Sequence, residues 1–184
     1  MEDLSRLIKD CAAGKSKAQA RLYQLYAPRM YGVCLRYSKG AAEAEDNLQD
    51  GFIKIFEKIG TFRHEGSFEG WMRRIMVNVS LEKYRKQNVL QTVDDLTPFE
   101  MPDMNDEIIS GISANDLLAL ISDLPPRYRM VFNLYVLEGM NHKEIAEEMR
   151  ISEGTSKSNL ARARIILKRQ IVKYFQQTEN NYSA

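Results

Sequence analysis

The chain has 184 residues, of which 44% are hydrophobic and 28% are charged, the proportions of a folded protein rather than a disordered segment. No apolar run approaches the roughly 20 residues that a membrane-spanning helix needs, and the N-terminus lacks the pattern of a secretory signal. We therefore expect a cytoplasmic protein. Two isolated cysteines and two distant histidines form neither a disulfide framework nor a metal site, so we expect no metal and no other cofactor.

The net charge of +1 is unevenly distributed. Residues 1–86 carry a net charge of +5, residues 87–126 carry −8 and residues 127–184 carry +4. Two basic blocks on either side of an acidic segment suggest two surfaces for anionic ligands, joined by a connector that avoids nucleic acid. Ordinary variation of charge along a soluble chain explains the same pattern equally well.

In the first block, apolar residues at helical spacing predict four helices, at about residues 4–13, 17–37, 41–59 and 67–86. Leu25 is expected to face the core, Pro28 to kink or break the second helix, and Ser67 to cap the fourth. Trp71, like the other apolar residues at these spacings, is expected in the core rather than at a cofactor.

The periodicity fades after residue 87, and prolines and acidic residues predict a linker there. Helices are expected again at 116–122, 127–137, 141–149 and 152–175, with no convincing strand anywhere. The sequence thus predicts an all-α fold of two small helical domains, 1–87 and 116–177, with an acidic linker at 88–115 and a disordered tail at 178–184.

The last two predicted helices are joined by a tight turn at 150–152, as in a helix-turn-helix, whose second helix enters the major groove. The first turns of that helix carry residues that suit contacts with base edges and phosphates. These candidate DNA-binding residues are Gly154, Thr155, Lys157, Ser158, Asn159 and Arg162. A helical hairpin whose basic residues only form a solvated face is the alternative.

The C-terminal block resembles the promoter-binding domain of extracytoplasmic-function sigma factors, a group of the sigma-70 family. The similar strings are LPPR at 124–127, EG at 138–139, KEIA at 143–146, GTSKS at 154–158 and RAR at 162–164. Ser156 departs from the pattern, because many members carry an aliphatic residue there, and its helical position predicts a partly buried hydroxyl. The resemblance implies that this domain binds the −35 element of a promoter.

The segment AEDNLQDGFIK at 44–54 resembles the polymerase-binding helix of the same family. Asp46, Gln49, Asp50 and Glu57 form an acidic, hydrogen-bonding stripe, which suits a basic partner. The resemblance implies that this partner is the clamp helices of the polymerase β′ subunit, and it adds Asn47 and Ile53 to the contact. Without the resemblance, a solvated helix face is the simpler interpretation.

Residues 62–78 resemble the family's segment that melts the −10 element. A protein that opens DNA without ATP must hold the unpaired bases, and an aromatic ring beside an amide is a suitable pocket. We therefore expect Phe62 and Asn78 to hold a flipped base, and Arg74, Arg85 and Lys86 to contact the strand.

Together these features predict a sigma factor that directs RNA polymerase core enzyme to specific promoters and promotes DNA melting. The resemblance implies three partners: the core polymerase, through its β′ clamp helices and β flap, promoter DNA and, in many members, an anti-sigma factor. The alternatives are a helix-turn-helix regulator that binds operators alone, which leaves the acidic stripe without a role, and a purely protein-binding adaptor. No nucleophile, acid–base pair or phosphate loop indicates an enzyme.

Overall fold

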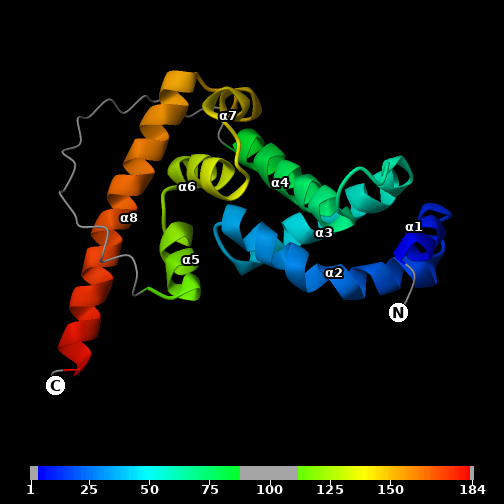
Figure 1. The fold of residues 1–184 in the computed structure, drawn as a ribbon, viewed down its shortest axis with the longest axis horizontal. Coiled ribbons are helices and arrows are strands. Elements are labelled where there is room, and N and C mark those ends of the chain that lie inside the picture. Colours follow the sequence, from blue (N-terminus) through cyan, green and yellow to red (C-terminus); the bar gives the residue numbers. More distant parts are fainter. Residues whose placement is uncertain (1–3, 88–111, 183–184) are drawn as a thin grey trace. The chain divides into compact units, whose positions relative to one another are not determined.

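The structure is a computed structural model that describes residues 4–87 and 112–182, with side chains as far as 177. Every regular element in these residues is a helix, which confirms the all-α prediction. The chain divides into two compact units, Met1–Asn88 and Val89–Ala184, coloured blue to green and green to red in Figure 1. Most of the predicted linker, residues 88–111, lies outside the described residues.

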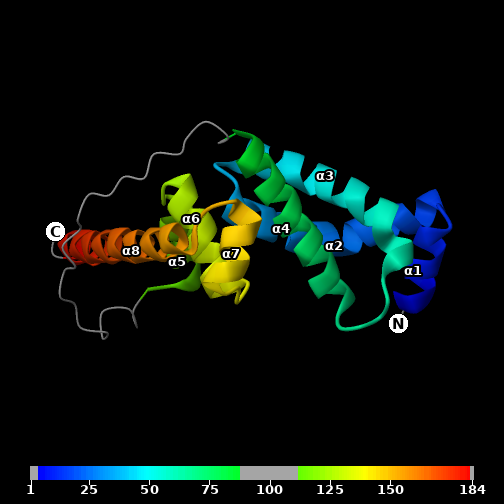
Figure 2. The ribbon, with the colours of Figure 1, turned by 90° about the horizontal axis from the view of Figure 1, so that it is seen from above.

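The first unit is a small helical bundle. It contains α1 (Leu4–Ala12), α2 (Ser16–Tyr37), α3 (Ala41–Lys58), a 3-10 turn η1 (Ile59–Thr61) and α4 (Phe68–Gln87). Helices α2, α3 and α4 pack on one another, and α1 packs against α2 and η1 (Figure 2). The fully buried side chains of this core include Leu22, Met30, Cys34, Ile55, Met72 and Met76.

Local signals explain two of the helix ends in this unit. Gly14 adopts a positive φ of 73° directly after α1, a conformation that favours glycine. The predicted cap Ser67 accepts a hydrogen bond from the backbone N–H of Gly70 at 3.0 Å. Helix α2 runs through Pro28 without the predicted break, although a proline inside a helix removes one backbone hydrogen bond and its ring crowds the carbonyl four residues earlier. Leu25 is 42% exposed, so its predicted burial is wrong: it lies beside the buried stripe of α2, not on it.

Helices α3 and α4 approach each other closely at Gly51. This glycine is buried, and a Cβ atom at its position would overlap the sulfur of Met76. The sulfur of Met76 also lies 3.8 Å from Sγ of Cys34, so α2, α3 and α4 meet at this point. The missing side chain at Gly51 therefore permits the observed spacing of α3 and α4.

The second unit is organised around one long helix. It contains α5 (Ala114–Ser122), α6 (Pro126–Phe132), a π-helical segment η3 (Asn133–Leu137), α7 (His142–Met149) and α8 (Glu153–Tyr182). Helices α5, α6 and α7 each pack against α8. One core cluster comprises Ile121, Leu124, Tyr128, Ala163 and Leu167. The helix predicted at 127–137 is thus α-helical only in its first part.

Both ends of this unit differ from the prediction. Helix α5 begins at Ala114 because Ser113 caps it, accepting a hydrogen bond from the backbone N–H of Asp116 at 3.2 Å. Helix α8 reaches Tyr182, so the disordered tail predicted for 178–184 is wrong for residues 178–182; no glycine or proline after Gly154 interrupts the helix. The Tyr174 hydroxyl donates to Oδ2 of Asp116 at 2.8 Å, and hydrogen bonds from Ser113 and Tyr174 lower the pKa of that carboxyl.

Candidate nucleic-acid interface

Helices α7 and α8 form a helix-turn-helix. A capping box holds the start of α7, and the turn lies between the residue that ends α7 and the cap that begins α8. Oδ1 of Asn141 accepts from the backbone N–H of Glu144 at 3.0 Å, and the Glu144 carboxylate accepts from the backbone N–H of Asn141 at 2.8 Å. Arg150 ends α7 in the left-handed conformation with φ 55°. Ser152 then caps α8, accepting from the backbone N–H of Thr155 at 3.0 Å.

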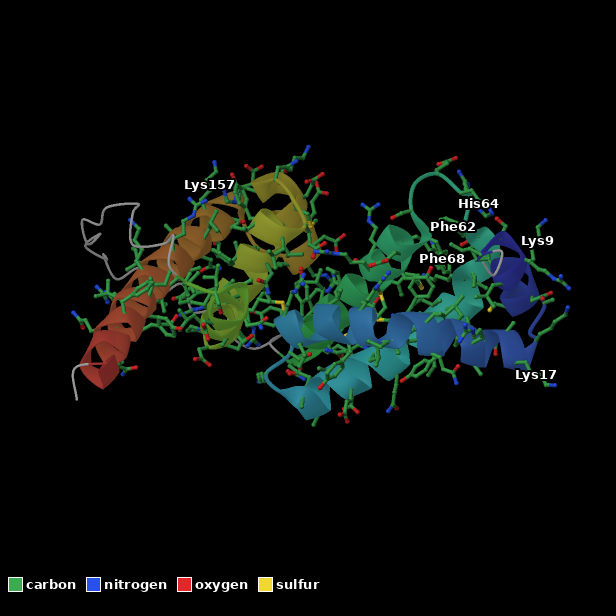
Figure 3. The ribbon with its side chains drawn as sticks, turned by 60° about the horizontal axis from the view of Figure 1, so that its bottom comes forward. Lys9, Lys17, Phe62, His64, Phe68 and Lys157 are labelled. Atoms are coloured by element: carbon green, nitrogen blue, oxygen red, sulfur yellow. The ribbon has the colours of Figure 1, made fainter. Side chains whose placement is uncertain are left out.

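The first turns of α8 present a polar surface. Gly154, Lys157 and Ser158 are exposed, and Thr155 and Arg162 are half-buried beside them. Figure 3 shows Lys157 near the start of α8 with its side chain directed outward. A Cβ atom at Gly154 would meet only Oγ of Ser152 at 3.6 Å, so packing within the protein does not require this glycine. Its predicted role in a close approach to DNA stays a prediction.

The structure contradicts the prediction that Asn159 contacts a base. Asn159 is only 6% exposed and shares the buried face of α8 with Ser156, Leu160 and Ala163. These positions repeat at intervals of three and four residues, which places them on one side of a helix. Ser156, predicted to be partly buried, is fully buried.

The predicted polymerase-binding residues of α3 lie at the surface, with one exception. Asp46, Gln49 and Asp50 are exposed, and Ile53 exposes 57% of its apolar side chain beside them. Asn47 is 1% exposed instead, and it cannot contact a partner directly as predicted.

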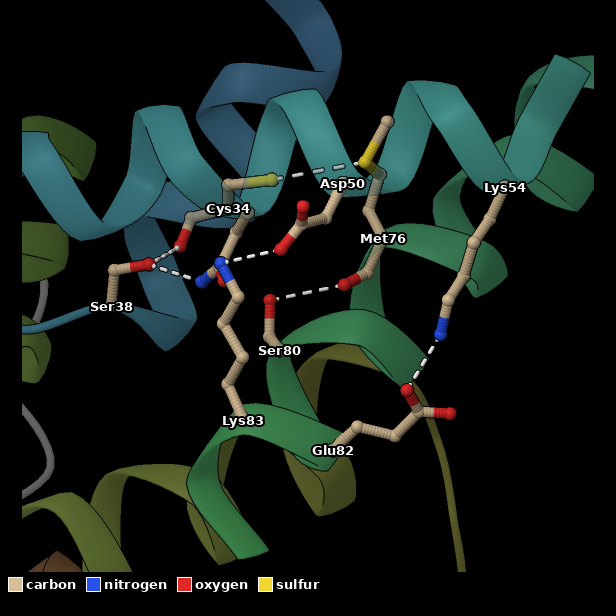
Figure 4. A network of polar contacts seen from close by, with 9 residues as sticks. Cys34, Ser38, Asp50, Lys54, Met76, Ser80, Glu82 and Lys83 are labelled. Atoms are coloured by element: carbon tan, nitrogen blue, oxygen red, sulfur yellow. Dashed lines mark hydrogen bonds and ion pairs between the residues drawn. The ribbon is translucent and has the colours of Figure 1, made fainter. Parts of the chain in front are cut away.

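The amide of Asn47 has a structural role. Its Nδ2 donates to Oγ of Ser38 at 2.9 Å, and that hydroxyl donates to the carbonyl of Cys34 at 2.8 Å (Figure 4). The two bonds tie the early turns of α3 to the end of α2, and thereby hold the helix that carries the acidic stripe.

Two ion pairs connect α3 to α4, as Figure 4 shows. Nζ of Lys83 lies 2.7 Å from Oδ2 of Asp50, and Nζ of Lys54 lies 2.6 Å from Oε2 of Glu82. The hydrogen bond from Lys54 lowers the pKa of Glu82. Because Asp50 is already paired, a basic partner would share its carboxylate with Lys83.

The loop before α4 carries a cluster of aromatic rings around the half-buried Phe62. The ring centroid of Phe62 lies 4.7 Å from that of His64, 5.1 Å from that of Phe68 and 5.6 Å from that of Trp71. Phe68 is buried, Trp71 is half-buried and His64 is exposed (Figure 3). His64 also has a positive φ of 59°, an uncommon conformation for a residue other than glycine. Among these partners of Phe62, the exposed His64 ring is the one that a base could displace.

The remaining predicted −10 residues lie along α4. Arg74, Asn78 and Lys86 are exposed and Arg85 is half-buried. Arg74 and Asn78 are one helical turn apart, so they share a face. None of the ring or hydrogen-bond contacts described above joins Phe62 to Asn78, and their shared pocket stays a prediction.

Family models match both units of the chain. The model for Sigma-70 region 2 matches residues 22–89, and the model for Sigma-70, region 4 matches residues 114–167.

The chain is also similar to several curated proteins. The ECF RNA polymerase sigma factor SigM of Bacillus subtilis is 31% identical over 149 residues, a match that covers 80% of this chain and 91% of that protein. SigW of the same species is 28% identical, with 91% and 96% covered. SigE of Mycolicibacterium smegmatis is 30% identical; the match covers 85% of this chain but 63% of that protein.

The chain is also similar to a chain in a solved structure. The sigma factor RpoE from Bartonella quintana, in complex with the anti-sigma factor NepR, gives a TM-score of 0.48 at 21% identity, and the match covers 84% of this chain and 96% of that one.

A region 2 unit followed by a region 4 helix-turn-helix defines the domain organisation of a sigma-70-type factor. The chain belongs to the extracytoplasmic-function (ECF) group of that family. This confirms the predicted function: a sigma factor is a regulatory DNA-binding protein that directs RNA polymerase to promoters. Within residues 4–87 and 112–182, no helix is long and apolar enough to cross a membrane, and no three metal-binding side chains come together.

Proposed function

We propose that the two units divide promoter recognition between them. The first binds core polymerase and captures the opened −10 strand, and the second docks on the −35 duplex. This proposal rests on one combination of features in a single chain. The helix-turn-helix of α7 and α8 occurs together with an exposed acidic face on α3 and an exposed basic face on α4. The chain contributes recognition while the polymerase makes the bonds, and the protein acts in the cytoplasm.

The second unit reads the −35 element through the first turns of α8. Lys157 and Ser158 are exposed there, and Arg162 is within one or two turns of them. Lysine and arginine contact phosphates or guanine edges, and the N-terminus of a helix favours phosphate. The exposed start of α8 thus combines positive charge with hydrogen-bond donors.

The first unit meets the polymerase through α3. Asp46, Gln49 and Asp50 offer acceptors to a basic partner, the β′ clamp helices, and Ile53 adds an apolar contact beside them. Because Lys83 pairs with Asp50, we expect Asp46 and Gln49 to be available without rearrangement.

The same unit holds the −10 strand through α4 and the loop before it. Arg74, Arg85 and Lys86 attract the phosphates of the unpaired strand, and the exposed amide of Asn78 offers hydrogen bonds to a base. Phe62 provides a stacking surface for a base at the edge of the core, on the side of its ring that contacts His64 in the free chain.

The polymerase interface is tested by Asp46→Lys combined with Gln49→Lys in the full chain. Both residues are exposed, so the free energy of unfolding should change by less than about 0.5 kcal/mol. Binding to core polymerase should weaken by about tenfold or more, because like charges then face each other. The measurements are co-purification with core polymerase and transcription from a pool of genomic promoters.

A matched control is Glu147→Lys combined with Gln176→Lys, two exposed residues of the second unit with the same total change of charge. Undiminished co-purification of the Asp46 and Gln49 variant would exclude this interface. If the free chain bound promoter duplex as tightly and specifically as the complete holoenzyme does, a stand-alone regulator would be the better description.

A further inference from the structure

His142, the first residue of α7, contacts two other helical segments of the second unit. Its Nδ1 lies 2.9 Å from Oγ of Ser156 in α8. Its ring stacks on Tyr135 of η3, with the ring centroids 4.8 Å apart, and the guanidinium of Arg164 lies 5.9 Å from the centroid of the same Tyr135 ring. One imidazole therefore joins η3, α7 and α8.

The partner of this imidazole is a buried hydroxyl. Ser156 has no exposed surface and lies in the apolar face of α8 with Leu160 and Ala163. A buried hydroxyl is costly to leave without a hydrogen bond, and the half-buried His142 supplies one from a different helix. Either group can donate, depending on the tautomer of the imidazole.

We propose that His142 is a positioning residue for the recognition helix. Ser156 directly precedes Lys157 and Ser158, the exposed residues proposed to meet DNA, so a shift or rotation of Ser156 is passed to them within the same turn. Apolar packing is not directional, whereas a hydrogen bond fixes both distance and direction. The His142–Ser156 bond thus sets the orientation in which α7 presents the start of α8. This inference rests on the proposed −35 function.

Two substitutions separate the hydrogen bond from the ring. The side-chain oxygen and nitrogen of asparagine lie the same number of bonds from Cβ as Nδ1 of histidine, whereas those of glutamine lie one bond further. Both His142→Asn and His142→Gln remove the stacking on Tyr135, so the two variants differ mainly in their reach toward Ser156. Each is also made together with Ser156→Ala, which removes the hydrogen-bond partner.

The test measures binding of the reconstituted holoenzyme to a duplex promoter that the unmodified chain selects, with its −35 element intact or scrambled. His142→Gln should bind the intact promoter roughly fivefold to tenfold more weakly than His142→Asn, the effect of about one net hydrogen bond. This difference should vanish when Ser156→Ala is added, and it should be absent on the scrambled element. In the free, unmodified chain, the ring nitrogen chemical shifts of His142 should change on Ser156→Ala.

Equal binding by the two His142 variants, or a difference that persists with Ser156→Ala, would overturn the positioning role. Unchanged nitrogen shifts would overturn the hydrogen bond itself. If the unmodified holoenzyme showed no preference for the intact −35 element, the proposed −35 function itself would be refuted. Equal binding by the two His142 variants, with that preference intact, would refute only the positioning role.

Discussion

Replacing glycine by alanine should have opposite effects at Gly32 and Gly51, because the two positions differ in packing. Both lie inside helices, in α2 and α3, where replacing glycine by alanine stabilises a helix by roughly 0.5–1 kcal/mol. A Cβ atom at Gly32 would have no other atom within 4 Å, so Gly32→Ala should gain that amount. A Cβ atom at Gly51 would overlap the sulfur of Met76.

The overlap should outweigh the helix propensity at Gly51. Met76 is fully buried and its sulfur contacts Cys34, so its side chain has little room to move aside. Overpacking of a core costs about 1–3 kcal/mol. Set against the gain in propensity, Gly51→Ala should destabilise the first unit by about 1–2 kcal/mol.

Tryptophan fluorescence during urea denaturation isolates this effect, because Trp71 is the single tryptophan of the chain and lies in the first unit. The midpoint of the transition should fall for Gly51→Ala and rise for Gly32→Ala. Adding Met76→Ala should remove most of the penalty of Gly51→Ala, since the two side chains compete for one space. Stabilisation by both glycine substitutions would refute the close approach of α3 and α4.

Four further predictions concern the proposed sites and the core of the first unit. Alanine at both Phe62 and Asn78 should preserve holoenzyme binding to duplex promoter but reduce the permanganate reactivity of unpaired thymines, since stacking on an aromatic ring is worth about 1–3 kcal/mol per base; normal opening would place the pocket elsewhere. The thiol of Cys34, whose pKa burial raises to about 12, should react with a thiol reagent at mildly alkaline pH only as fast as the first unit opens, and prompt labelling of the folded chain would contradict its burial. Arg162→Ala should weaken −35 binding by roughly 1–3 kcal/mol. Asn159→Ala should instead cost about 1 kcal/mol of stability and leave sequence preference unchanged; altered preference would show that Asn159 reaches DNA.

Most of the helices, and several of their starting points, could be predicted because the signals are local. Ser67 is predicted to cap a helix, and Asn141 and Ser152 stand at the predicted starts of two others; each of the three accepts a hydrogen bond from the backbone of the first turn that follows it. A cap requires one side chain and three or four neighbouring residues, so the sequence contains nearly all the information that determines it.

The two errors at the candidate sites have one cause. Asn47 is placed at a surface by the family resemblance and Asn159 by its chemical type, although both positions belong to buried stripes. Asn47 lies one turn after the buried Ala44, and Asn159 lies one turn before the buried Ala163. The helical spacing of their apolar neighbours could have revealed both, because a face is defined by register whatever residue occupies it.

Other features could not be predicted from local patterns. The contacts between Lys83 and Asp50, between Met76 and Gly51, and between His142 and Ser156 each join two different helices. They depend on how the helices pack, which a single sequence without co-varying positions does not specify.

Helix α8 also determines where a spectroscopic label would report on docking. Its 30 residues, at about 1.5 Å per residue, span about 45 Å from the DNA-facing turns to Tyr182. A fluorophore attached after Tyr182 is therefore far enough from the major groove to leave binding undisturbed. Because α8 is one helix from those turns to Tyr182, distances from such a label to dyes placed along the promoter would measure the angle at which that helix enters the groove.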